Sequence, residues 1–211
     1  DAASGVRVAK ASNDRLCNIV RNHPDRFAAF ANLPTADPIA AADELERSVE
    51  KLGFKGAMVH GLIGEDRLFI DDKQFWPIFE RAQALDVPLY IHPANPHPGM
   101  VDIYLKDYVE SYPHILQAGW GFTIETATIG LRIVLSGVLD KYPDVKIILG
   151  HLGEGLPFLM RRIDMALNRP GNKGVKFREL FTSNFYITTS GFFSDPALLC
   201  CIQEMGTDHI M

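Results

Sequence analysis

The chain has 211 residues and a formal net charge of -5, with 47% hydrophobic and 22% charged residues. This composition is typical of an ordinary globular protein, and the length suits one domain or a large part of one. Basic residues gather only into pairs such as Arg161 and Arg162. This argues against nucleic-acid binding, because the phosphate backbone requires a concentrated positive surface. No apolar run approaches the roughly 20 residues that cross a bilayer.

Cysteine usage and the N-terminal residues bear on location. Cys17, Cys200 and Cys201 fit no disulfide framework, so a reducing cytoplasm is the expected location. The first residues have neither the basic nor the apolar segment of a signal peptide. Because residue 1 is Asp rather than Met, we expect that it is not the first residue made.

Short apolar runs alternate along the chain with longer amphipathic segments. Turn residues separate them, and Asp37-Pro38, for example, suits the N-cap and first turn of a helix. The predicted strands are 27–33, 56–60, 89–92, 145–151 and 185–190, with a sixth opening at 208–211. The predicted helices are 37–52, 71–85, 122–141, 155–168 and 196–205; a Pro- and Gly-containing excursion fills 93–114, and a helical piece precedes 185.

This alternation predicts an α/β fold in which a parallel sheet is covered by helices. The chain contains no internal repeat, low-complexity tract or linker. We therefore expect one domain over residues 1–211. Two architectures fit six strand–helix units: a doubly wound open sheet and an incomplete (β/α)₈ barrel. Composition does not choose between them.

Three histidines fall at the C-terminal ends of predicted strands: His60, His92 and His151. In a barrel, side chains from different strand ends converge at this face, where active sites are built. A single His at a strand end is more often structural. Three histidines in corresponding places make a shared site the stronger interpretation. For His60, however, a packing role and a substrate contact are equally open.

His92 and the pair His151 and Glu154 are the main candidates for chemistry. His92 ends an apolar strand before Pro93; neutral imidazole is a good ligand for Zn²⁺ or Mn²⁺, and a hydrogen bond to a loop carbonyl is the alternative. His151 and Glu154 lie three apart among glycines, which allow a sharp turn that points both into one cavity. A carboxylate bound to an imidazole raises its basicity; alternatively, Glu154 stabilises a helix N-terminus.

Four segments resemble the decarboxylase branch of the amidohydrolase superfamily, whose members include γ-resorcylate, 2,3-dihydroxybenzoate, salicylate and 5-carboxyvanillate decarboxylases, with aminocarboxymuconate-semialdehyde decarboxylase more distant. The resemblance runs from about Arg15 to Met211, and Gly-His-Leu-Gly-Glu-Gly-Leu-Pro at 150–157 is its most specific part. The segments are Leu89–Pro98, Val145–Pro157, Arg162-Ile163-Asp164 and Tyr186–Gly191.

The resemblance implies a TIM barrel of the metal-dependent hydrolase type with one divalent metal ion, zinc or manganese. It identifies His92 with the family's central metal ligand, His151 with its catalytic His and Glu154 with the carboxylate partner of that His. Arg162 matches an Arg that reaches the substrate of a neighbouring subunit, which implies a dimer or tetramer. At the position of His60, relatives commonly carry Asn.

The same resemblance implies that this chain is a truncated barrel. The first two strands, with their acidic or His ligand pair, and the end of the eighth strand, with its Asp, are expected to be missing. As it stands, the chain is therefore expected to bind metal poorly.

The implied activity is non-oxidative decarboxylation of a hydroxylated aromatic acid of the ortho-hydroxybenzoate type. Trp120, Phe122 and Phe192 or Phe193 are candidates for ring stacking, with core packing as the alternative. Two other functions stay open. One is metal-dependent hydrolysis of a lactone, ester or amide on the same barrel, and the other is a non-catalytic barrel remnant that serves as a binding or structural subunit.

Overall fold

The computed structural model describes residues 1–64 and 68–211. Its central feature is a five-stranded sheet in which every neighbouring pair of strands is parallel. A separate antiparallel pair, β3 (Leu62–Ile63) and β4 (Leu68–Phe69), follows the second strand. The sheet contains β1 (Ala31–Asn32), β2 (Ala57–His60), β5 (Leu89–His92), β6 (Ile147–Leu149) and β7 (Phe185–Ile187).

The strand order in space follows the order in the chain, β1-β2-β5-β6-β7. A doubly wound sheet reverses direction at a switch point, whereas a barrel adds each new strand on the same side of the last. The order therefore selects the barrel arrangement over the open sheet. The predicted sixth strand begins where expected, because Ile210 forms a parallel bridge with Ile187, and the N–H of Met211 donates to the carbonyl of Ile187 at 2.8 Å.

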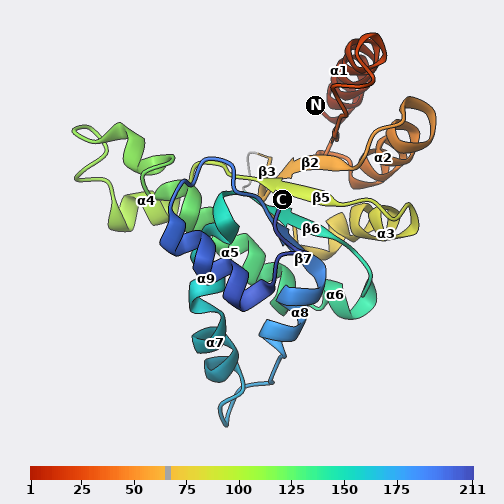
Figure 1. Ribbon diagram of the computed structural model, residues 1–211. Coiled ribbons are helices and arrows are strands. Elements are labelled where there is room, and N and C mark those ends of the chain that lie inside the picture. The colour runs from red at the N-terminus through yellow and green to blue at the C-terminus, as the bar shows by residue number, and fades with distance from the viewer. Residues whose placement is uncertain (65–67) are drawn as a thin grey trace.

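Helices connect the strands and surround the sheet (Figure 1). Among the residues that the structure describes, no helix is both long and apolar enough to cross a membrane. Short 3₁₀ segments include η1 (Lys73–Phe75) and η2 (Pro113–Leu116), and a tight turn with positive φ angles, η3 (His151–Gly155), follows β6. The α-helices are α1 (Ala2–Asn22), α2 (Pro38–Leu52), α3 (Trp76–Ala84), α4 (Pro98–Tyr104), α5 (Gly121–Ser136), α6 (Val138–Lys141), α7 (Leu156–Leu167), α8 (Phe177–Asn184) and α9 (Asp195–Met205).

The two faces of the sheet differ in burial. Along β2 and β5 buried and less buried residues alternate, and Val59 and Ile91 lie in the core while His60 and His92 face the other way. Successive residues of a strand point to opposite faces. The buried face packs into one hydrophobic core with side chains of α2, α3, α5 and α8. The opposite face, where a barrel has its interior, carries the histidines.

The structure corrects several predicted boundaries. The helix expected over 122–141 is broken at Gly137, whose φ of 86° lies in the left-handed region, so α5 and α6 are separate. The strands are shorter than the apolar runs, since residues 27–30 and 188–190 lie outside the ladders. The excursion after His92 contains α4, which stands on an arm projecting from the body (Figure 1). Helix α1 and the β3–β4 pair were not predicted.

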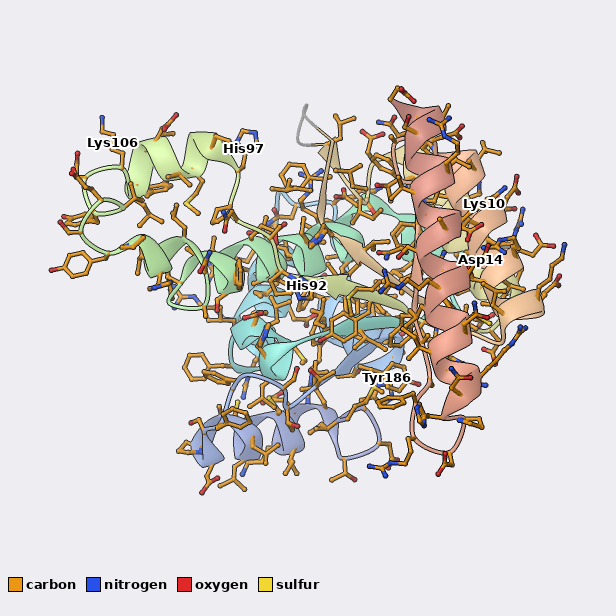
Figure 2. All side chains as sticks on the ribbon, turned by 90° about the horizontal axis from the view of Figure 1, so that it is seen from above. Lys10, Asp14, His92, His97, Lys106 and Tyr186 are labelled. Atoms are coloured by element: carbon orange, nitrogen blue, oxygen red, sulfur yellow. The ribbon has the colours of Figure 1, made fainter. Side chains whose placement is uncertain are left out.

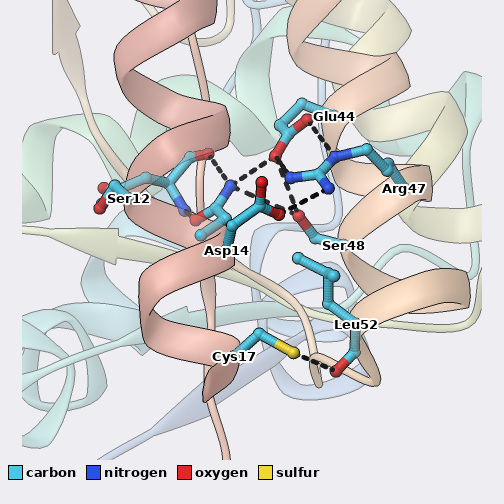
Figure 3. A network of polar contacts seen from close by, with 9 residues as sticks. Ser12, Asp14, Cys17, Glu44, Arg47, Ser48 and Leu52 are labelled. Atoms are coloured by element: carbon cyan, nitrogen blue, oxygen red, sulfur yellow. Dashed lines mark hydrogen bonds and ion pairs between the residues drawn. The ribbon is translucent and has the colours of Figure 1, made fainter. Parts of the chain in front are cut away.

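A buried polar network joins α1 to α2 (Figure 3). The Asn13 amide donates to the Asn32 carbonyl at 2.9 Å and to Glu44 Oε1 at 2.7 Å, and its oxygen accepts from the Asn32 N–H at 2.9 Å. Arg47 then pairs with Glu44 and with Asp14, each at 2.8 Å. Asn13 and Glu44 are almost fully buried. Such groups are costly unless every partner is present, so the network fixes how α1 docks against β1.

We predict that Asn13→Ala lowers the free energy of unfolding by about 2–4 kcal/mol, because it removes a buried donor from Glu44 and removes the side-chain partner of both polar groups of the Asn32 backbone. Chemical denaturation of the two proteins measures the change. The control is Ser12→Ala, which removes an exposed hydrogen bond to Asn32 and should cost less than about 0.5 kcal/mol. Equal effects of the two substitutions would contradict the role assigned to the network.

Candidate active site

Parallel register brings the predicted histidines to one edge of the sheet. His60 is directly opposite His92 in the β2–β5 ladder, and His151 follows β6 by two residues. The rings of His60 and His92 lie edge to face, with centroids 5.3 Å apart. Figure 2 shows His92 near the middle of the molecule, while His97 and Lys106 lie out on the arm. The prediction that strand ends converge is confirmed for these residues.

His151 begins a left-handed turn that extends through Gly155. The five φ angles are 52° at His151, 55° at Leu152, 70° at Gly153, 54° at Glu154 and 79° at Gly155. This conformation costs roughly 1–2 kcal/mol for each residue that is not glycine. Glycine at 153 also relieves crowding, since a Cβ there would lie 3.0 Å from Ile187 Cγ2.

Contacts with β6 and β7 hold this turn in place. The N–H of Leu152 donates to the carbonyl of Thr188 at 2.8 Å, and the N–H of Gly153 donates to that of Gly150 at 2.9 Å. The Leu152 side chain is buried in the core. The glycines of 150–155 were correctly interpreted as allowing a sharp turn, and the structure identifies it as one turn of left-handed helix.

The turn brings Glu154 against His151. Glu154 Oε1 lies 2.5 Å from His151 Nδ1, and Oε2 accepts from the Thr123 hydroxyl at 2.9 Å. The Glu154 side chain is only 3% exposed, whereas that of His151 is 30% exposed. The hydrogen bond from Nδ1 to Glu154 raises the pKa of His151 above its usual value, against the smaller effect of burial. This bond occupies Nδ1 and leaves Nε2 as the nitrogen for a ligand.

His92 has a similar arrangement at the end of β5. Its Nδ1 lies 2.8 Å from the carbonyl oxygen of Pro93 and donates to it. The hydrogen bond to a loop carbonyl is therefore observed, and it is compatible with the predicted role as a metal ligand, because a carbonyl that engages Nδ1 leaves the Nε2 lone pair for a metal ion. Across residues 1–64 and 68–211, no three His, Cys, Asp or Glu side chains converge as a metal site. His92 fits a divalent metal as one ligand of a larger set.

A cavity of about 460 Å³ joins these groups. His92, His151 and Glu154 line it together with Thr123. An aromatic wall completes it, formed by Trp120, Phe122 and Phe192. Its volume lies within the range of small-molecule sites. A polar side faces an apolar side, so the cavity suits a flat, partly apolar anion.

Two predicted residues lie outside this lining. His60 is next to His92 and its Nδ1 is 3.3 Å from the His92 carbonyl oxygen, but it does not line the cavity. Arg162 is exposed on α7 and also lies outside it. Phe193 is 92% exposed, which leaves Phe192 as the aromatic residue of that loop in the cavity.

Two residues near the site, Thr123 and Glu125, were not predicted from the sequence. Glu125 is 5% exposed on α5, and burial raises the pKa of its carboxyl to about 7. One signal was available: Glu125, Ile129 and Ile133 follow each other at intervals of four, so the acid lies on the buried stripe of an amphipathic helix. Nothing in the sequence marks the Thr123 hydroxyl as a partner of Glu154.

Comparisons with known proteins agree with this geometry. The family model described as amidohydrolase matches residues 1–211. The chain belongs to the amidohydrolase family. Among its relatives, γ-resorcylate decarboxylases from Polaromonas sp. (strain JS666) and Rhizobium sp. (strain MTP-10005) are 43% and 40% identical over 222 residues. Each match covers 100% of this chain and 66% of the relative, so the chain spans just under two thirds of their length.

Solved structures give the same result. The crystal structure of 2,6-dihydroxybenzoate decarboxylase complexed with 2,6-dihydroxybenzoate matches with a TM-score of 0.90 and 41% identity, covering 100% of this chain and 66% of that one. A dihydroxybenzoic acid decarboxylase from Polaromonas sp. JS666, with bound manganese and the inhibitor 2-nitroresorcinol, has a TM-score of 0.90 and 44% identity, covering 100% and 65%. The predicted family is therefore confirmed.

We predict that Glu154→Gln lowers the pKa of His151, because the amide cannot stabilise the protonated imidazole as a carboxylate does. Titration of the His151 ring by NMR measures this pKa directly. Glu110→Gln, which changes an exposed carboxylate on the arm, is the control and should leave the titration unchanged. An identical His151 titration in both variants would contradict the pairing.

A second prediction concerns Glu125 and stability. Its folded-state pKa of about 7 exceeds the usual 4.5, so the unfolded chain releases the proton first and stability is lost as pH rises between these values. The loss amounts to roughly 3 kcal/mol. Glu125→Gln should therefore be more stable relative to the unsubstituted protein at pH 8 than at pH 4, by about that amount. Denaturant unfolding at both pH values tests this; a constant difference would contradict it.

Proposed function

We propose that the protein is a metal-dependent decarboxylase that removes CO₂ from a hydroxylated aromatic acid of the ortho-hydroxybenzoate type. The observation that carries the proposal is the cavity in which His92 and the His151–Glu154 pair face Trp120 and Phe122. Support also comes from the similarity to enzymes named for 2,6-dihydroxybenzoate and γ-resorcylate.

His92, the aromatic residues of the cavity and His151 each have a different role in the proposed reaction. A divalent ion, zinc or manganese, held in part by His92 Nε2, supplies when bound the positive charge that anchors a carboxylate and the neighbouring phenolate. Trp120, Phe122 and Phe192 hold the ring against that charge. His151, kept basic by Glu154, donates from Nε2 to a phenolic oxygen and stabilises its developing charge.

The reaction is a proton-for-carboxylate exchange at one ring carbon. That carbon gains a proton, its bond to the carboxylate carbon breaks, the electron pair returns to the ring and CO₂ leaves. The family pattern assigns the proton donor to the last-strand Asp, which is not among residues 1–211. Protonated His151 withdraws electron density through the phenolic oxygen as the ring recovers its aromaticity.

We also assign substrate contacts to His60, from its place at a strand end, and to Arg162, as the resemblance implies. Arg162 is an exposed cation on α7, away from its own cavity, so it serves a site only in a neighbouring subunit. A homodimer or homotetramer follows from this assignment. A cytoplasmic location stays a prediction from cysteine usage.

The assay uses the full-length protein loaded with Mn²⁺ and measures CO₂ release from 2,6-dihydroxybenzoate. His151→Asn keeps a donor toward Glu154 but removes Nε2, so we predict that kcat falls by about 10²–10⁴-fold with the fold intact. The control is His97→Asn, an exposed residue that caps α4 outside the cavity, and its activity should be unchanged.

Two outcomes would overturn the proposal. Opening of a lactone without CO₂ release would favour the hydrolase, whose nucleophile is a hydroxide and whose base is His151. Absence of any turnover from a metal-loaded full-length protein would favour the non-catalytic remnant. Near-normal decarboxylation by His151→Asn would reject the role assigned to His151 alone.

A further inference from the structure

Glu125 is a buried acid that the proposed reaction does not use. It lies on the same stripe of α5 as Ile129 and Ile133, both of which are fully buried. A carboxyl group in such a place costs several kcal/mol of desolvation unless it is well paired. An apolar side chain at position 125 would fill the same space without this desolvation cost. The presence of an acid there therefore needs a specific explanation.

The pairing of this carboxyl is incomplete. Glu125 Oε2 accepts from the N–H of Ala94 at 3.4 Å and from the Thr126 hydroxyl at 3.3 Å. Within residues 1–64 and 68–211, the buried Oε1 has no hydrogen-bond partner. A Cβ added to Gly61 would lie 3.0 Å from Oε1. The carboxyl therefore lies beneath the rim, between the residue that follows His60 and the second residue after His92.

The contact with Ala94 reaches His92 through a single peptide group. The N–H of Ala94 and the carbonyl of Pro93 belong to the same planar peptide unit, which moves as one body. The carbonyl of this unit accepts from His92 Nδ1 at 2.8 Å, and its N–H points to Glu125 at 3.4 Å. One rigid plane therefore joins the buried carboxyl to the imidazole.

We propose that Glu125 is a positioning residue that fixes the ring orientation and the tautomer of His92 through the Pro93–Ala94 peptide. The carboxyl holds the peptide N–H, the peptide carbonyl holds Nδ1–H, and Nε2 is thereby presented to the cavity as the ligand atom. Metal-binding histidines are generally oriented by a carboxylate or a carbonyl behind them. Here the carboxylate of Glu125 holds the Pro93–Ala94 peptide, and the carbonyl of that peptide orients His92. The inference rests on the role of His92 as a metal ligand in the proposed function.

The test measures Mn²⁺ affinity of the full-length protein and, in the metal-free protein, the ¹⁵N shifts of the His92 ring, which report its tautomer. Glu125→Leu should weaken Mn²⁺ binding by about 10–100-fold and allow both His92 tautomers, because the peptide loses its anchor. Glu125→Gln retains an oxygen that can accept from Ala94, and should rescue both measurements to within about two-fold of the unsubstituted protein.

A matched control separates positioning from loss of a buried acid in general. Glu44 is 1% exposed in the α1–α2 network, away from the site. Glu44→Leu should reduce stability without altering Mn²⁺ affinity or the His92 shifts. If Glu125→Leu does not fold, Glu125→Asp withdraws the carboxylate from Ala94 by one methylene group and should weaken Mn²⁺ binding in the same direction.

Two results would overturn the inference: unchanged His92 shifts and Mn²⁺ affinity in Glu125→Leu or Glu125→Asp, or a loss in Glu125→Gln as large as in Glu125→Leu. A different result would reject the proposed function. An unsubstituted protein that binds Mn²⁺ but releases no CO₂ from 2,6-dihydroxybenzoate would reject the activity and leave the role of Glu125 in place. If the unsubstituted protein does not bind Mn²⁺, the ¹⁵N shifts of the His92 ring alone test the inference.

Discussion

The left-handed turn from His151 to Gly155 is the constraint on which the rest of the site depends. Three of its residues are not glycines, and each occupies a conformation that costs roughly 1–2 kcal/mol. The hydrogen bond from Leu152 to Thr188 and the burial of the Leu152 side chain offset that cost. Strain of this kind persists where the surrounding structure over-determines it. The parallel pairing of β6 with β7 therefore determines the distance between His151 and Glu154.

Helix α5 donates hydrogen bonds to two buried carboxyls. Thr123 in its first turn donates to Glu154 at 2.9 Å, and Thr126 donates to Glu125 at 3.3 Å. Glu154 also has an imidazole at 2.5 Å, whereas one oxygen of Glu125 has no hydrogen-bond partner in the part of the chain that the structure describes. Burial raises the pKa of the Glu125 carboxyl to about 7, because its two long hydrogen bonds only partly offset the loss of solvation, and the nearby Glu154 carboxylate adds a smaller repulsion. Two acids of nearly equal burial therefore have different surroundings: Glu154 is paired with His151, whereas Glu125 keeps its proton to a higher pH than an exposed carboxyl does.

The sequence predicted the strand ends better than the elements between them. An apolar run that stops at a His followed by Pro93 or by glycines marks where a strand leaves the sheet, so the residue pattern alone groups His92, His151 and Glu154. Helix α1 was missed although its buried residues, Ala9, Asn13 and Cys17, recur at intervals of four, because none of the three is a large apolar residue. The contacts of Glu125 depend on the peptide after Pro93, and such long-range proximity leaves no local pattern.

Chemistry and recognition lie on different parts of the fold. His92 and His151 are fixed by strand pairing, while Trp120 stands at the base of the α4 arm and Phe192 lies in the loop after β7. Loops of this kind tolerate change more readily than the strands that carry the reacting groups. The half-exposed Trp120 and Phe192 therefore form a wall that can be reshaped without disturbing the imidazoles. Under the proposed function, Trp120 and Phe192 would contact the ring of the substrate, so substitutions in the arm and in the β7 loop would change which ring is accepted while His92 and His151 keep their places.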